Sequence, residues 1–179
     1  MSRVIALATL FALGACARNV GDDDGVGDDD DRPPGGRDAG IDGLPPDDDD
    51  LVWRSANLTN FTSYPEPGSK ECEEFNGCTW AGHFAFVEGQ QTEEWVMAHN
   101  IAAVHSRDGD TYGLKTLRLR HGDRRIEVTV YDECSDSDCD GCCTRNASET
   151  GFLIDLESYT AERFGTWDGI VEFACVDCD

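Results

Sequence analysis

Two segments in the C-terminal half of this 179-residue chain constrain its fold most. Residues 126–134 read IEVTVYDEC, with an apolar side chain at every second position before an acidic residue, and predict a half-buried strand. Residues 152–165 read FLIDLESYTAERFG and predict a strand that passes into a short helix ended by Gly165. Asp132 and Asp155 therefore stand at the ends of two strands, where small barrels build their sites. A pair of carboxylates in such a place points to carbohydrate chemistry or carbohydrate binding.

The remaining patterns of the second half are mostly those of β-strands. Gly122 and Asp123 form a turn signal between two alternating runs and predict a hairpin. The strands predicted from alternation and from apolar runs cover residues 79–87, 112–120, 125–131 and 169–176. Residues 95–104 are a mostly apolar run that fits either a buried strand or a short helix. A mainly β chain with one short helix, at residues 157–164, before its last strand indicates a small barrel.

The first 16 residues predict a bacterial lipoprotein signal. Arg3 precedes an apolar run at residues 4–13 that is too short to span a bilayer as a helix. The run ends in Leu-Gly-Ala-Cys, which resembles a lipobox, so we expect Cys16 to be lipidated. Ala17 after the cysteine resembles an outer-membrane address, which predicts a periplasmic or surface-exposed protein. An ordinary cleaved signal peptide or a buried helix is the alternative.

Residues 17–50 predict a disordered tether between the lipid and the domain. Three runs of aspartate, separated by glycine and proline, repel one another and bury little apolar surface. Weak calcium binding by these aspartates is the alternative, but no run has the spacing of a calcium loop. The folded part is expected at residues 51–179, which is long enough for one domain.

Charge excludes some partners of the domain. The chain has 37 acidic and 14 basic residues, and the part after residue 50 is acidic as well. Nucleic acid is not expected as a partner, because phosphate binding needs a basic surface. Contact with an anionic membrane is expected only through the N-terminal lipid. Neutral polysaccharides and cationic ligands remain compatible with an acidic surface.

The nine cysteines predict a disulfide-bonded domain in an oxidising compartment. Cys16 is assigned to the lipid, and the even number that remains favours bridges. The eight cysteines expected to pair are Cys72, Cys78, Cys134, Cys139, Cys142, Cys143, Cys175 and Cys178. The two C-x-x-C pairs leave zinc as the alternative, although the adjacency of Cys142 and Cys143 favours disulfides. The spacing does not choose among the possible pairings.

The C-terminal elements resemble the double-psi β-barrel of expansin-like and barwin-like proteins, which endoglucanase-45-like enzymes and the rare lipoprotein A family share. The matching residues are VTVYDEC at 128–134, IDL at 154–156, Phe164 and GIVEF at 169–173. The resemblance implies a small six-stranded barrel, with residues 62–64 as its opening strand. We therefore expect an expansin-like, mainly β domain over residues 51–179.

The resemblance also implies site residues. Asp155 matches the general acid of the hydrolases, which expansins retain without clear hydrolysis, and Asp132 matches an acidic residue of the same groove. Tyr64, Tyr131 and Trp80 are the aromatic residues expected to contact the sugar. Caps of a turn and of a helix are the structural alternatives for Asp132 and Asp155.

Two departures from the family pattern count against hydrolysis. Ile154 stands where the hydrolases and many expansins have histidine, and no aspartate adjoins Tyr64 to serve as the catalytic base. No cofactor and no metal are expected. The run Asp136-x-Asp138-x-Asp140 begins like a calcium loop but has Ala147 where a bidentate glutamate is needed.

Three functions fit these residues. The first is a lipid-anchored, monomeric barrel that binds cellulose, chitin or peptidoglycan and loosens it without hydrolysis. The second is a wall-degrading glycoside hydrolase or lytic transglycosylase with Asp155 as its acid. The third is a structural or adhesive surface protein. Whether the protein is an enzyme is left open by the residues alone, with non-hydrolytic binding favoured.

Overall fold

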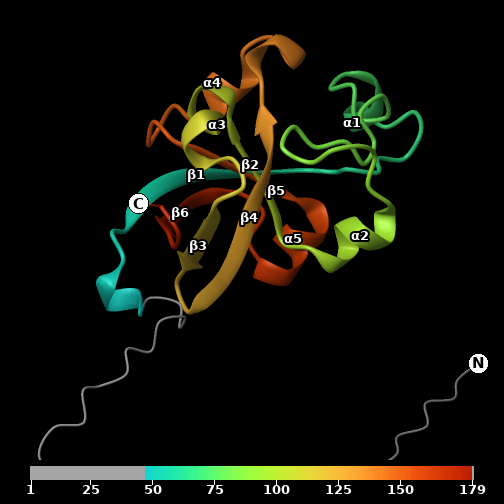
Figure 1. Cartoon of the computed structure of the whole chain (residues 1–179). Helices are drawn as coiled ribbons and strands as arrows, with labels where there is room; N and C mark the ends of the chain where they lie inside the picture. Colours follow the sequence, from blue (N-terminus) through green and yellow to red (C-terminus); the bar gives the residue numbers. More distant parts are fainter. Residues whose placement is uncertain (1–46, 179) are drawn as a thin grey trace, which may run out of the picture. The chain divides into compact units, whose positions relative to one another are not determined.

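The computed structural model describes residues 47–178, and their centre is a closed barrel of six strands (Figure 1). The strands follow the order β1-β5-β2-β4-β3-β6 around the barrel. Their bounds are β1 (Arg54–Phe61), β2 (Ile101–His105), β3 (Thr116–His121), β4 (Arg124–Cys134), β5 (Leu153–Glu157) and β6 (Gly169–Cys175). The pairs β1/β5 and β2/β4 are parallel, and the other four pairs are antiparallel. The mainly β, six-stranded, disulfide-bonded barrel expected from the sequence is confirmed.

The barrel interior is filled by alternate residues of every strand. Val128 and Val130 of β4 are buried there, as the alternation of residues 126–134 predicted. Phe152 stacks on Phe173 with 4.5 Å between ring centroids, and Tyr112 packs edge-on against both rings. Burial of each such side chain contributes about 1.5–3 kcal/mol, so the barrel interior is the main source of stability.

Several short helices surround the barrel, where the sequence predicted one. They are α1 (Lys70–Glu73), α2 (Glu93–Ala98), α3 (Ser106–Tyr112), α4 (Cys142–Asn146), α5 (Ser158–Phe164) and the 3₁₀ turns η1 (Asp48–Asp50) and η2 (Asp136–Asp138). The predicted helix is α5, and Gly165 ends it in the left-handed region with φ +70°. The other helices have four to seven residues, too few for a hydrophobic period to be read from the sequence.

The structure corrects three of the predicted strands. Residues 79–87 form turns with an isolated bridge between Phe84 and Val87, because the chain reverses at Gly82, whose φ is +68°. Residues 112–115 end α3 and form a turn, so that β3 begins only at Thr116. Residues 62–64 are not a strand, since the first barrel strand is the preceding β1.

The ambiguous apolar run at residues 95–104 belongs to two elements. Its first part lies in α2, where the Thr92 hydroxyl caps the helix by accepting a hydrogen bond from Trp95 N at 3.3 Å. Its second part is β2, all five residues of which are buried. The predicted hairpin between β3 and β4 is present, and Gly122 turns with φ +59°.

All eight cysteines of the domain form disulfides, which confirms the bridge prediction over the zinc alternative. The pairs are Cys72–Cys78, Cys134–Cys143, Cys139–Cys142 and Cys175–Cys178. Each bridge closes a short stretch of chain outside the barrel interior. The adjacent Cys142 and Cys143 therefore bind different partners and pin the loop after β4 at two points.

The predictions for Cys16 and for most of the tether lie outside the described residues. Within the described part, the Asp48 carboxylate lies 2.9 Å from Arg118 Nη1, and the Trp53 indole donates to the Asp48 carbonyl at 3.0 Å. The last residues before β1 are therefore held against the barrel. Among residues 47–178, no helix has the length and apolar content needed to cross a membrane.

Candidate functional site

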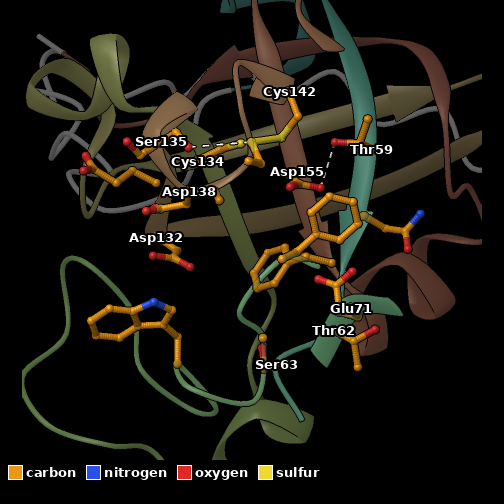
Figure 2. A pocket seen from close by; sticks show the side chains of 18 of the residues that line it. Thr59, Thr62, Ser63, Glu71, Asp132, Cys134, Ser135, Asp138, Cys142 and Asp155 are labelled. Carbon is orange, nitrogen blue, oxygen red and sulfur yellow. Dashed lines mark hydrogen bonds between the residues drawn. A yellow bond between two sulfur atoms is a disulfide. The ribbon is translucent and has the colours of Figure 1, made fainter. Parts of the chain in front are cut away.

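The register of four neighbouring strands brings the two predicted carboxylates into one row. Ala103 of β2 pairs with Asp132 of β4 on one side and with Asp155 of β5 on the other. Asp155 in turn pairs with Thr59 of β1. Since neighbouring strands lie about 4.8 Å apart, the Cα atoms of the two aspartates are roughly 10 Å apart. The row Thr59, Asp155, Ala103 and Asp132 lines a cavity of about 620 Å³ (Figure 2).

The cavity lies on the outer side of the barrel wall. Ile154 and Leu156, the neighbours of Asp155 along β5, are fully buried in the barrel interior. Successive residues of a strand point to opposite faces, so Asp155 points outward. Ile154 faces the interior and takes no part in this site.

A β-bulge turns Asp132 toward the same cavity. Ala102 pairs with Val130 but Ala103 pairs with Asp132, so Tyr131 is an extra residue in β4. Without this shift, Asp132 would share the face of Val130, which is buried in the interior. Bulges commonly re-aim side chains next to functional sites, and here the bulge places a carboxylate in the cavity.

Asp155 is partly buried and has one hydrogen-bond partner among the described side chains. The Thr59 hydroxyl donates to Asp155 Oδ1 at 2.8 Å (dashed in Figure 2). Burial raises the pKa of Asp155 to about 7; the hydrogen bond from Thr59 opposes this shift, and the charges of Glu71 and Asp132 add to it. A substantial fraction of Asp155 is therefore protonated at neutral pH, and the side chain can donate a proton or a hydrogen bond.

Asp132 is held by the backbone at the other end of the row. The Ala85 amide donates to Asp132 Oδ1 at 2.9 Å. Burial raises the pKa of Asp132 to about 6, hydrogen bonds from the Ala85 and Glu133 amides oppose the shift, and the charges of Glu133 and Asp138 add to it. Asp132 is thus more readily ionised than Asp155.

Glu71 of α1 is a third carboxylate of the cavity, and the sequence reasoning missed it. Burial raises the pKa of Glu71, and a hydrogen bond with the Thr62 backbone opposes the shift. In the view of Figure 2, Glu71 lies on one side of Asp155, and Asp132 lies on the other. Glu71 was missed because it lies in a short acidic segment far from Asp155 in sequence. The local feature that could have drawn attention to this segment is the neighbouring Cys72, which forms a disulfide with Cys78.

Close packing at Gly77 holds the turn of α1 in place. A Cβ on Gly77 would approach the Glu71 carbonyl oxygen to 2.8 Å and Pro65 Cγ to 3.0 Å. The Gly77 amide donates to that same carbonyl at 3.0 Å. A glycine is therefore needed for the chain to pass close enough to position Glu71.

Aromatic side chains line the mouth of the cavity. Trp80, predicted to contact sugar, lines it and is 60 % exposed, and Phe75 lines it and is 40 % exposed. Tyr64 and Tyr131 are not among its lining residues. Both pack in a separate apolar cluster, where Tyr131 meets Trp95 at 5.3 Å between centroids and the Tyr64 hydroxyl donates to the Gln91 carbonyl. Tyr131 is the extra residue of the bulge.

The calcium-like run of aspartates serves the loop after β4. Asp136 accepts hydrogen bonds from the Thr144 amide at 2.9 Å and the Thr144 hydroxyl at 2.6 Å. These bonds lower the pKa of Asp136 and tie η2 to α4. Asp138 instead lines the cavity. Asp136 therefore holds the loop together, whereas Asp138 belongs to the cavity wall.

Three of the four cysteines around this loop, Cys134, Cys139 and Cys142, line the cavity, and Cys143 is buried beside them. The sulfur atoms of all four lie within 4.8 Å of one another, a spacing that suits a metal ion. They are joined as two disulfides, in which the sulfurs are no longer thiolate ligands. In the part of the chain that the structure covers, the loop is therefore a disulfide-bonded wall of the cavity.

Comparison with known proteins adds little to this geometry. No protein-family model matches the chain, and no curated protein matches it. Among solved structures, it is similar to the apo form of an expansin from Clavibacter michiganensis, with a TM-score of 0.43 and 13 % identity. The similarity covers 70 % of this chain and 50 % of that one, so the chain spans about half the length of that expansin. We therefore argue the function from the residues of the cavity.

Proposed function

We propose that the protein binds a cell-envelope polysaccharide in the outer cavity of its barrel. The observation that supports this most is the row of Thr59, Asp155 and Asp132 in a cavity that the exposed side chain of Trp80 also lines. A sugar ring has an apolar face that stacks on an aromatic ring and hydroxyl edges that bond to carboxylates. A cavity that combines convergent polar groups with aromatic side chains is typical of a ligand site.

Binding and loosening without hydrolysis is the first form of this proposal. Near neutral pH, Asp155 exchanges between a form that donates a hydrogen bond and a form that accepts one. Sugar hydroxyls do both, so Asp155 competes with the hydroxyls of neighbouring chains for the same partner. Such competition separates polymer chains without breaking a covalent bond.

Cleavage of the polymer is the second candidate, and the protonation of Asp155 favours it. A general acid must be protonated at working pH, and a pKa of about 7 meets this need. Asp132 and Glu71 supply the second carboxylate for which the sequence showed no match. An inverting hydrolase needs its two carboxyl groups roughly 6.5–9.5 Å apart, which a row with Cα atoms two strands apart allows.

The cellular setting belongs to the same proposal. We infer that Cys16 carries a lipid, that residues 17–50 tether the domain of residues 51–179, and that the monomer acts at the outer membrane of a bacterium. The proposed partner is cellulose, chitin or peptidoglycan. An acidic domain held near the envelope would meet these polymers without needing contact with nucleic acid or lipid headgroups.

A pull-down with product analysis tests the function. The oxidised protein is incubated with cellulose, chitin and peptidoglycan, followed by reducing-sugar and muropeptide assays, with Asp155→Asn and the exposed control Asp110→Asn in parallel. Binding without products, weakened in Asp155→Asn alone, supports loosening, and products that vanish in Asp155→Asn support cleavage. No binding to any polymer would reject the proposal and favour a structural or adhesive role.

A further inference from the structure

We propose that the cavity selects polysaccharides whose sugars carry free amino groups over acetylated, neutral and acidic ones. The inference rests on the proposed function, because it names the substrate class of the same cavity. It goes beyond that function in assigning a positive charge to the ligand.

The charge of the cavity wall is the first argument. Among the described residues that line it, five have carboxylate side chains and none is lysine or arginine. The five are Glu71, Asp132, Glu133, Asp138 and Asp155. They come from α1, β4, η2 and β5, so four separate elements direct acidic groups to one cavity. An anionic sugar, such as a uronic acid, would be repelled here.

The lack of internal counterions is the second argument. The described part of the chain contains ion pairs at other places, such as Arg120 with Glu172 at 2.8 Å and Arg118 with Glu127 at 2.6 Å. None of these pairs involves a carboxylate of the cavity. Burial is the main cause of the raised pKa values of Asp155 and Asp132; the charges of Glu71 and Asp132 add to the shift at Asp155, and those of Glu133 and Asp138 add to the shift at Asp132. A bound ammonium group would relieve the repulsion between these carboxylates, which a neutral sugar cannot do.

Ser63 provides an argument that does not depend on charge. Its side chain lines the cavity, is only 7 % exposed, and its hydroxyl has no hydrogen-bond partner in the structure. A buried hydroxyl without a partner is destabilising, so the site is most stable when a ligand atom bonds to it. Figure 2 shows Ser63 in the cavity wall. Both an amine and a hydroxyl of a sugar can serve as that partner.

The exposed aromatic rings favour a cationic ligand whose positive group is attached to a sugar ring. Trp80 and Phe75 offer apolar faces at the mouth of the cavity. A flat sugar ring covers such a face, and its amino group at the ring edge reaches the carboxylates below. A basic peptide would satisfy the charge but has no ring of this kind at each positive group.

Titration calorimetry with matched oligosaccharides tests the inference. The full oxidised protein is titrated at about pH 6, well below the usual pKa of an α-amino group, with hexamers of glucosamine, N-acetylglucosamine, glucose and a uronic acid. We expect the glucosamine hexamer to bind about tenfold more tightly than the acetylated one, as one or two charge-assisted hydrogen bonds would give. An oligolysine of the same charge is the control for attraction without sugar recognition.

Variants locate the selectivity. Asp132→Asn with Asp155→Asn should remove the roughly tenfold preference, whereas Asp110→Asn, an exposed charge on α3 outside the cavity, should keep it. Ser63→Ala should weaken the binding of the glucosamine hexamer and of the acetylated hexamer by a similar factor. Circular dichroism of each variant confirms that it is folded.

The outcomes separate this inference from the proposed function. Equal affinity for the glucosamine and acetylated hexamers overturns the amino-sugar inference, as does oligolysine binding as tight as glucosamine binding. The proposal of polysaccharide binding is tested separately by the pull-down. A preference that survives in the Asp132 and Asp155 double variant overturns the amino-sugar inference as well. Absence of binding to every hexamer and every polymer overturns both.

Discussion

At the scale of single residues, the site depends on carboxylates that are kept out of water. Asp155 and Asp132 have pKa values of about 7 and about 6, mainly because burial disfavours their charged forms. The folded protein therefore binds more protons than the unfolded chain between about pH 4 and pH 7. The contribution of these two groups to stability is fully present only below the unfolded pKa and is lost as pH rises through the folded values.

Asp155→Asn should consequently stabilise the fold at alkaline pH. The neutral amide avoids the cost of an ionised carboxylate, and we expect the free energy of unfolding to rise by about 1–3 kcal/mol at about pH 8, with little change at about pH 4. Urea denaturation at the two pH values measures this. Asp110→Asn controls for the loss of one negative charge. An Asp155→Asn variant that is no more stable than wild type at alkaline pH would contradict the raised pKa of Asp155.

At the scale of elements, local signals decided where α5 and the β3/β4 hairpin form. Gly165 takes the left-handed conformation at the end of α5, and its amide donates to the Ala161 carbonyl at 2.8 Å. Gly122 likewise takes a left-handed conformation, at the turn of the β3/β4 hairpin. These positions were predictable because a glycine after a periodic run is a local feature. The bulge at Tyr131 had no such signal, since it depends on how β4 pairs with β2.

Gly165→Ala should lower the free energy of unfolding by about 1 kcal/mol without changing ligand binding, because a Cβ is strained at φ +70°. Chemical denaturation monitored by tryptophan fluorescence measures the loss. Glu162→Ala, an exposed change on the same helix, should stay within about 0.5 kcal/mol of wild type. Equal stability of Gly165→Ala and wild type would show that this cap is dispensable.

At the scale of the whole molecule, different contacts hold the barrel interior and the α1 wall of the cavity. The barrel has its own interior, whereas the wall formed by α1 and the segment up to α2 lies beside it and is pinned by Cys72–Cys78 (Figure 1). A second bridge, Cys175–Cys178, joins the last residue of β6 to the segment that follows it and does not line the cavity. Removing each bridge in turn therefore distinguishes an effect on ligand binding from an effect on folding.

Replacement of Cys72 and Cys78 by serine should abolish glycan binding while the barrel stays folded. Glu71 and Trp80 would lose their positions, and the bridge itself contributes about 2 kcal/mol to stability. The same change at Cys175 and Cys178 should cost a similar free energy and leave binding intact. Pull-down and circular dichroism of both double variants check this, and equal binding by the two would show that the α1 wall is not part of the site.

Alternation along the chain and the cysteine count predicted a mainly β, disulfide-bonded small barrel, because period two and composition are local properties of the chain. The number of six strands came from the resemblance to expansin-like proteins. Asp155 and Asp132 could be singled out from the local sequence, as acidic residues beside apolar strands. Their convergence on one cavity depended on the register through Ala103 and on the bulge, and the entry of Glu71 depended on the path of a bridged turn. That Tyr64 and Tyr131 pack in a separate apolar cluster also depended on tertiary structure, since the face that a side chain occupies follows from pairing between strands and turns distant in sequence.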